Sequence, residues 1–197
     1  MKNKMLMITA IVVMSINAIA MAAPKPSDPE RQTPWDLYVD SKEAYDLKMK
    51  LGDKALFIDV REPAEIMFTG FTDVVDVNIP FMFVNIKKWH PKKPVLLMEK
   101  NPDFARDIEK ALIKKGLSKN DAVLIMCRSG GTRGAPAANM LFDKGFKKVY
   151  VVTDGFEGGV VKEGDKKGWR LKNGWKNSGL PWSYKLNKEK MYYKSSF

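Results

Sequence analysis

The sequence predicts a three-layer α/β domain, with a mainly parallel central sheet and helices on both faces. Two continuous apolar runs of strand length, 55–60 and 122–126, indicate strands that are covered on both faces. Segments with helical periodicity separate the expected strands, and a strand, helix and strand in succession imply a parallel crossover. The chain has 197 residues, which is enough for one domain with its own core.

The first half of this domain alternates between strand and helix signals. A short strand is expected at 36–39, and the helix 41–51 follows it and is ended by Gly52. The apolar run 55–60 is the next strand. A short helix then follows, and Gly70 stops it.

The second half continues the alternation. In chain order we expect a strand at 74–80, an irregular insertion with exposed aromatic side chains at 81–94, a helix at 101–115, a strand at 122–126, a helix at 135–144 and a final strand at 148–152. The last two strands and the helix between them form one more parallel crossover.

The two ends of the chain are expected to lie outside the domain, which we place at 35–159. Residues 1–22 combine lysines, an apolar stretch and small residues in the order of a cleaved secretory signal. We therefore expect a periplasmic or secreted protein with no membrane span after cleavage. Residues 23–34 have the composition of a flexible leader with little reason to pack. Residues 160–197 are interpreted as an aromatic arm packed on the domain.

The charge and the cysteine content limit the classes of function that the sequence allows. The chain carries 34 Lys and Arg against 23 Asp and Glu, which favours small anions or acidic partners, and an exported protein does not normally meet nucleic acid. The single cysteine, Cys127, cannot form an intrachain disulfide, so it is either an inert core residue or retained for its chemistry. The only histidine, His90, is interpreted as a surface residue. No metal-ligand spacing is present, and we expect no cofactor.

Cys127 stands where the strand 122–126 gives way to the loop CRSGGTRG. Ligand sites of open α/β sheets lie at the carboxyl ends of strands. Glycines let successive amides turn inward as an anion nest, and the following helix points its positive end at the same place. The loop therefore predicts an anion cradle that favours the thiolate. The candidate catalytic residues are Cys127 and Arg133, and the candidate substrate-binding residues are Arg128, Ser129, Gly130, Gly131 and Thr132.

Three stretches resemble the rhodanese family of sulfurtransferases: FIDVREPAE with the following Gly70, VLIMCRSGG, and KVYVVTDGFEGG. The resemblance implies that Cys127 takes the outer sulfur of a thiosulfate-like donor as a persulfide and passes it to a thiophilic acceptor. The implied partners are a small anionic sulfur donor and this acceptor, and an exported protein partner is a further expectation.

Four charged residues of the first stretch are interpreted as structural. Asp59 and Arg61 match the family's first cluster, and we expect them to form a buried pair, because buried charges need partners. Glu62 and Glu65 are interpreted as residues that favour a helix start.

The spacing of the loop leaves a second enzyme class open. Arg133 lies six positions after Cys127, one more than in the family's Cys-Arg-x-Gly-x-Arg pattern. The sequence CRSGGTR also fits C-x-x-G-x-x-R, the spacing of cysteine-dependent phosphatases, and an arsenate reductase would use the same cradle. A phosphatase needs an acid for its leaving group, for which Asp154 and Glu157 are the candidates. Arg128 directly after the cysteine favours sulfur transfer.

A third alternative is a non-catalytic sulfur or anion carrier. Such a protein would dock a partner through the insertion and the aromatic arm. An exposed apolar patch around Phe81, Phe83 and Trp89 would support it.

Overall fold

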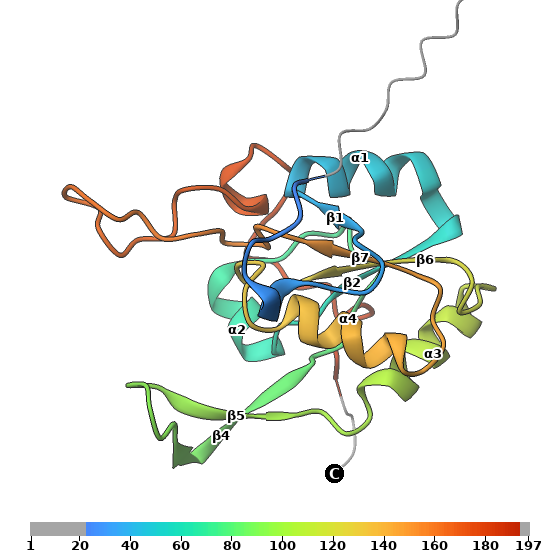
Figure 1. Cartoon of the computed structure of the whole chain (residues 1–197), viewed down its shortest axis with the longest axis horizontal. Coiled ribbons are helices and arrows are strands. Elements are labelled where there is room, and N and C mark those ends of the chain that lie inside the picture. The colour runs from blue at the N-terminus through green and yellow to red at the C-terminus, as the bar shows by residue number, and fades with distance from the viewer. Residues whose placement is uncertain (1–22, 194–197) are drawn as a thin grey trace, which may run out of the picture.

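The computed structural model describes residues 23–193, so the expected secretory signal at 1–22 lies outside the described residues. The centre is a parallel sheet whose strands follow the order β1, β7, β6, β2 and β3 (Figure 1). The bounds are β1 (Tyr38–Val39), β2 (Ala55–Asp59), β3 (Val77–Asn78), β6 (Ala122–Met126) and β7 (Lys148–Val152). The helices are α1 (Ser41–Leu51), α2 (Pro63–Thr69), α3 (Phe104–Lys114) and α4 (Gly134–Phe142), with the 3₁₀ turns η1 (Pro29–Arg31), η2 (Gly52–Lys54) and η3 (Trp175–Asn177).

Helices cover both faces of the sheet, so the expected three-layer α/β fold is confirmed. On one face the buried side chains of α3 and α4 pack against the strands, and on the other face those of α1 and α2 do so. All five residues of β2 and of β6 are buried, as their continuous apolar runs predict. Among the described residues, no helix has the length and apolar character needed to cross a membrane.

The insertion is regular, and the expectation of an irregular segment is wrong. Strands β4 (Met82–Trp89) and β5 (Leu96–Lys100) form an antiparallel hairpin that stands away from the central sheet in Figure 1. The predicted exposed patch is also different, because Phe81 is buried whereas Trp89 is exposed. The strand expected at 74–80 is reduced to β3.

The leader packs on the domain, so the expectation that it makes few contacts is wrong. The side-chain amide of Asn139 in α4 donates a hydrogen bond to the carbonyl oxygen of Gln32. The amide of Thr33 donates to the hydroxyl of Tyr38 in β1. The turn η1 itself lies beside α4, and the guanidinium of Arg31 lies close to Gly131 in the loop that follows Cys127.

The C-terminal segment contributes to the core through Trp175, which is fully buried. Its ring lies 5.7 Å from that of Phe57 in β2, and its indole N–H donates to the carbonyl oxygen of Pro181. Trp169, in contrast, is exposed, and the chain between Val160 and Arg170 projects from the domain (Figure 1).

Candidate active site

Cys127 follows β6 directly, at the carboxyl edge of the parallel sheet, and only 2% of its surface is exposed. The N-terminus of α4 lies beside the thiol, because a Cβ added at Gly134 would stand 3.8 Å from Sγ. The N-terminus of α4, the end of a helix that attracts anions, therefore lies next to the Cys127 side chain.

The loop from Arg128 to Arg133 has a set of unused backbone donors. Within residues 23–193, none of the backbone amides of this loop donates a hydrogen bond to a protein acceptor. Consecutive amides without a protein acceptor at a helix N-terminus are typical of a site for an anion. The candidate binding residues Ser129, Gly130, Gly131 and Thr132 all lie in this loop.

Backbone contacts behind the loop hold its shape. Gly130 has a φ of +63°, and a Cβ there would lie 1.7 Å from the carbonyl oxygen of Thr153. The amide of Phe156 donates to the carbonyl oxygen of Cys127 at 2.8 Å, and the amide of Glu157 donates to that of Arg128. The turn after β7 thus supports the loop from behind, and only glycine fits at the closest approach.

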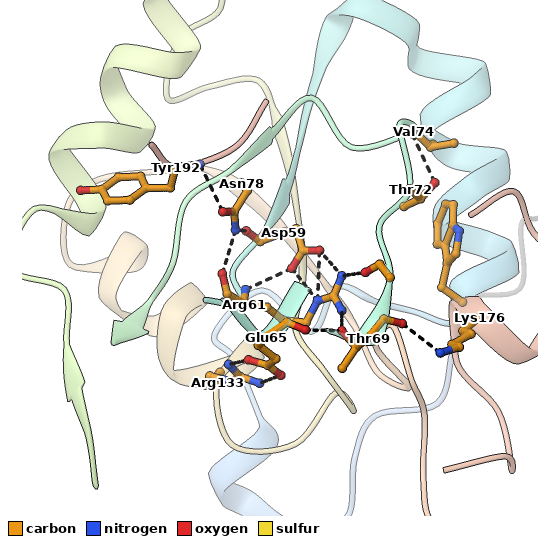
Figure 2. A network of polar contacts seen from close by, with 12 residues as sticks. Asp59, Arg61, Glu65, Thr69, Thr72, Val74, Asn78, Arg133, Lys176 and Tyr192 are labelled. Atoms are coloured by element: carbon orange, nitrogen blue, oxygen red, sulfur yellow. Dashed lines mark hydrogen bonds and ion pairs between the residues drawn. The ribbon is translucent and has the colours of Figure 1, made fainter. Parts of the chain in front are cut away.

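Arg133 is not a free anion-binding group, because it is held by Glu65 of α2. Its two terminal nitrogens donate to the two carboxylate oxygens at 2.6 and 2.7 Å (Figure 2). Burial acts to raise the pKa of Glu65, but the hydrogen bonds and charge of Arg133 outweigh it and hold that pKa below its ordinary value. Of the five N–H donors of the guanidinium, Glu65 accepts two.

The buried pair of Asp59 and Arg61 forms as expected, and it contacts the end of the helix that carries Glu65. The Arg61 guanidinium donates to both carboxylate oxygens of Asp59, and neither side chain is exposed. Its remaining donors reach Thr69 and the carbonyl oxygen of Gly70 at the end of α2. The pair therefore ties the start of α2 to its end, and Glu65 lies between them (Figure 2).

Arg128, the other arginine of the loop, is directed toward the turn after β7. Its Nε lies 2.5 Å from the Glu157 carboxylate, and the side chain is partly exposed. Arg170 from the C-terminal segment lies nearby and donates to the carbonyl oxygen of Gly158. Burial, together with the positive charge of Arg128, lowers the pKa of Arg170. The site thus includes a basic residue that the sequence analysis did not select.

A groove of about 790 Å³ opens between the hairpin and the loop, and we name it the hairpin groove. Arg128, Thr132 and Arg133 line it on the loop side. The other wall consists of α2 and hairpin residues: Glu62, Glu65, Met82, Val84, Trp89, His90, Lys93, Val95, Leu96, Leu97 and Met98. His90, expected to be an ordinary surface residue, is part of this wall.

The two acids considered for a phosphatase are engaged elsewhere. The carboxylate of Asp154 accepts hydrogen bonds from Ser41 at 2.7 Å and from the amide of Gly174 at 3.0 Å. Burial raises the pKa of Asp154 in spite of these bonds. Glu157 is paired with Arg128. Among the described residues, no group of three or more potential metal ligands occurs.

Comparison with known proteins identifies the family. The model of the rhodanese-like domain matches residues 42–162. The chain belongs to the rhodanese-like domain family. An uncharacterized protein of Rickettsia rickettsii is 29% identical over 144 residues, which cover 73% of this chain and 94% of that protein. A second, from Rickettsia prowazekii, is 28% identical over the same length.

A solved structure supports the fold of this rhodanese-like domain. The crystal structure of Rv0390 from M. tuberculosis superposes with a TM-score of 0.54 at 24% identity. The match covers 75% of this chain and 97% of that one. The rhodanese-like match places Cys127 and its loop inside the family domain, whereas Arg170 and Trp175 lie beyond it.

Glu65 is the site residue whose contact the sequence analysis missed. Its position near the start of α2 accounts for a helix-start role, and nothing local indicates a partner 68 positions away. The signal that could have found it is a carboxylate in the first turn of the helix after a buried strand, on the same edge of the sheet as a basic loop.

Proposed function

We propose that this protein is a sulfurtransferase that carries sulfane sulfur on Cys127 as a persulfide. The observation that carries the proposal is the position of Cys127 at the start of a loop whose amides donate to no protein group, beside the N-terminus of α4. Membership of the rhodanese-like family supports it. We further propose that the protein works outside the cytoplasm, on the basis of the signal-like residues 1–22.

In the first step the Cys127 thiolate attacks the outer sulfur of a thiosulfate-like donor. The bond between the two donor sulfurs breaks, and sulfite leaves with the electron pair. The loop amides and the helix N-terminus stabilise the negative charge that moves through the site. The N–H groups of Arg133 that Glu65 does not use would hold the donor's oxyanion.

In the second step a thiolate acceptor attacks the outer sulfur of the Cys127 persulfide. A new bond between sulfurs forms on the acceptor, and the electron pair of the broken bond returns to Cys127 as thiolate. The enzyme is then ready for another donor, and no cofactor is needed in either step.

The engagement of Asp154 and Glu157 favours sulfur transfer over ester hydrolysis. A phosphatase needs an acid to protonate its leaving group, whereas Asp154 is bonded to Ser41 and the Gly174 amide, and Glu157 is paired with Arg128. The longer loop, which suits a tetrahedral anion, keeps the phosphatase or arsenate reductase as the second candidate. A carrier without turnover is the third.

The test compares wild type with Cys127→Ser in a thiosulfate and thiol turnover assay and in a phosphate ester hydrolysis assay. We expect wild type to release sulfite, the serine variant to be inactive, and neither protein to hydrolyse the ester. Ester hydrolysis that depends on Cys127 would replace the proposal by the second candidate. Sulfur loading without turnover to any thiol would favour the carrier.

A further inference from the structure

The hairpin groove has apolar surface that the domain leaves uncovered. Trp89 is 64% exposed, and Val95 and Leu96 are exposed as well. Val84 pairs with Met98 across the hairpin, so both side chains lie on one face, and both line the groove. Exposed apolar side chains gathered at a concave surface are typical of an interaction site.

The hairpin also offers backbone groups for pairing. Among the described strands, β4 and β5 pair only with each other, so each has one edge that no strand covers. On β4 the amide of Val84 donates to the Glu62 carboxylate. A free edge is a template for a further extended chain, and such addition is a common mode of peptide recognition. The groove is therefore shaped for a peptide segment in extended conformation, rather than for a small donor alone.

The charge of the hairpin indicates which kind of peptide segment the groove would bind. Its lysines are Lys87, Lys88, Lys92, Lys93 and Lys100, and its one carboxylate, Glu99, is paired with Lys88. No carboxylate of residues 23–193 forms an ion pair with the other four lysines. On the opposite wall Glu65 and Glu157 already neutralise the two loop arginines. In the groove itself Glu62 opposes Lys93, so the net positive field comes from the hairpin as a whole, which carries five lysines against Glu99. This field is complementary to an acidic segment.

We propose that the hairpin groove binds an extended, acidic and partly apolar segment of a protein acceptor, which presents its cysteine thiol to Cys127. This inference rests on the proposed sulfur transfer and names the class of its acceptor. The groove reaches Arg128, Thr132 and Arg133 of the Cys127 loop, so a bound segment lies beside the site at which the second step takes place.

The test uses two synthetic peptides that each carry one cysteine. In one, leucines alternate with glutamates, and in the other lysines replace the glutamates. The persulfidated protein is mixed with either peptide or with free cysteine, and kcat/KM for sulfur transfer is measured. We expect the acidic peptide to be faster than the basic one by about tenfold at low salt, with a difference that shrinks as salt rises.

Two charge variants show whether the groove causes this preference. Lys93→Glu should lower kcat/KM for the acidic peptide about three- to tenfold and leave transfer to free cysteine unchanged. Lys147→Glu makes the same charge change at the residue directly before β7, outside the groove. This variant should change neither rate. Equal rates for both peptides, or equal effects of both variants, would overturn the proposal.

A binding measurement separates failure of the groove from failure of the proposed function. Cys127→Ser protein is titrated with the acidic peptide in which serine replaces cysteine, and Lys93→Glu is added to that background. Binding weakened by Lys93→Glu, without sulfur transfer in the wild type, supports the groove and refutes the sulfurtransferase.

The last experiment measures binding of the protein to vesicles of phosphatidylglycerol. Binding to them that Lys93→Glu abolishes, with no preference between peptides, would make the surface a membrane contact and overturn the proposal.

Discussion

Glu65→Gln tests whether the contact with Arg133 limits the positive charge of the site. The substitution removes the negative charge and keeps the size of the side chain. Glu65 and Arg133 are both mostly buried, with side-chain exposures of 17% and 8%, and they share two short hydrogen bonds. A hydrogen bond to a charged group contributes about 1.5–3 kcal/mol, and a glutamine keeps one acceptor. We therefore expect a loss of about 2 kcal/mol in the free energy of unfolding.

The same change should strengthen anion binding. With its guanidinium released, Arg133 can offer paired donors to thiosulfate or to sulfate, for which about 1.4 kcal/mol corresponds to tenfold. We expect KM for thiosulfate and the inhibition constant for sulfate to fall about tenfold. Glu62→Gln is the matched control, because Glu62 lines the same groove but forms no ion pair with an arginine of residues 23–193. Unchanged anion affinity in Glu65→Gln, or an equal effect in Glu62→Gln, would refute the reasoning.

The pH dependence of the stability difference gives an independent check. Arg133 holds the pKa of Glu65 below its ordinary value, so the pair stabilises the folded state fully above the unfolded pKa of about 4.3. This contribution is lost as pH falls through the lower folded pKa. Urea unfolding of wild type and Glu65→Gln should therefore differ by a constant amount at pH 6 to 8, and by less and less below about pH 4. A difference that grows in acid would contradict the pairing.

Two further predictions concern the support of the site. Gly130→Ala should reduce sulfur transfer at least tenfold, because its Cβ would meet the carbonyl oxygen of Thr153. Gly145 also has a positive φ but has open space around it. Gly145→Ala should therefore change only the stability, by about 1 kcal/mol. Trp175→Ala should lower the free energy of unfolding by about 3–5 kcal/mol in chemical denaturation, whereas exposed Trp169→Ala should leave it almost unchanged. Equal activities of the two glycine variants, or equal stabilities of the two tryptophan variants, would count against these assignments.

Most of the fold could be predicted from local sequence patterns. The strands β2 and β6 are continuous apolar runs, and their burial on both faces follows from that composition. The loop after Cys127 could be located because a strand, a glycine-rich turn and a helix follow one another without interruption. The Asp59 and Arg61 pair could be predicted because two opposite charges two positions apart, at the end of a buried strand, need each other.

Non-local contacts account for what the sequence did not reveal. The hairpin of β4 and β5 was missed because Pro91 and Pro94 in its connection, with several lysines, read as an irregular loop. The bond between Glu65 and Arg133 joins positions 68 apart, and only the crossover from β2 to β6 brings them together. The burial of Trp175 likewise depends on a segment without helix or strand periodicity, which no local pattern places.

Intact-mass analysis after incubation with thiosulfate tests the central claim most directly. The account predicts that the wild-type protein gains the mass of one sulfur atom, that peptide mapping places it on Cys127, and that an added thiol removes it. Cys127→Ser should gain nothing. A wild-type protein that stays unmodified after incubation with thiosulfate and with polysulfide, or a sulfur atom bound anywhere other than Cys127, would contradict the account.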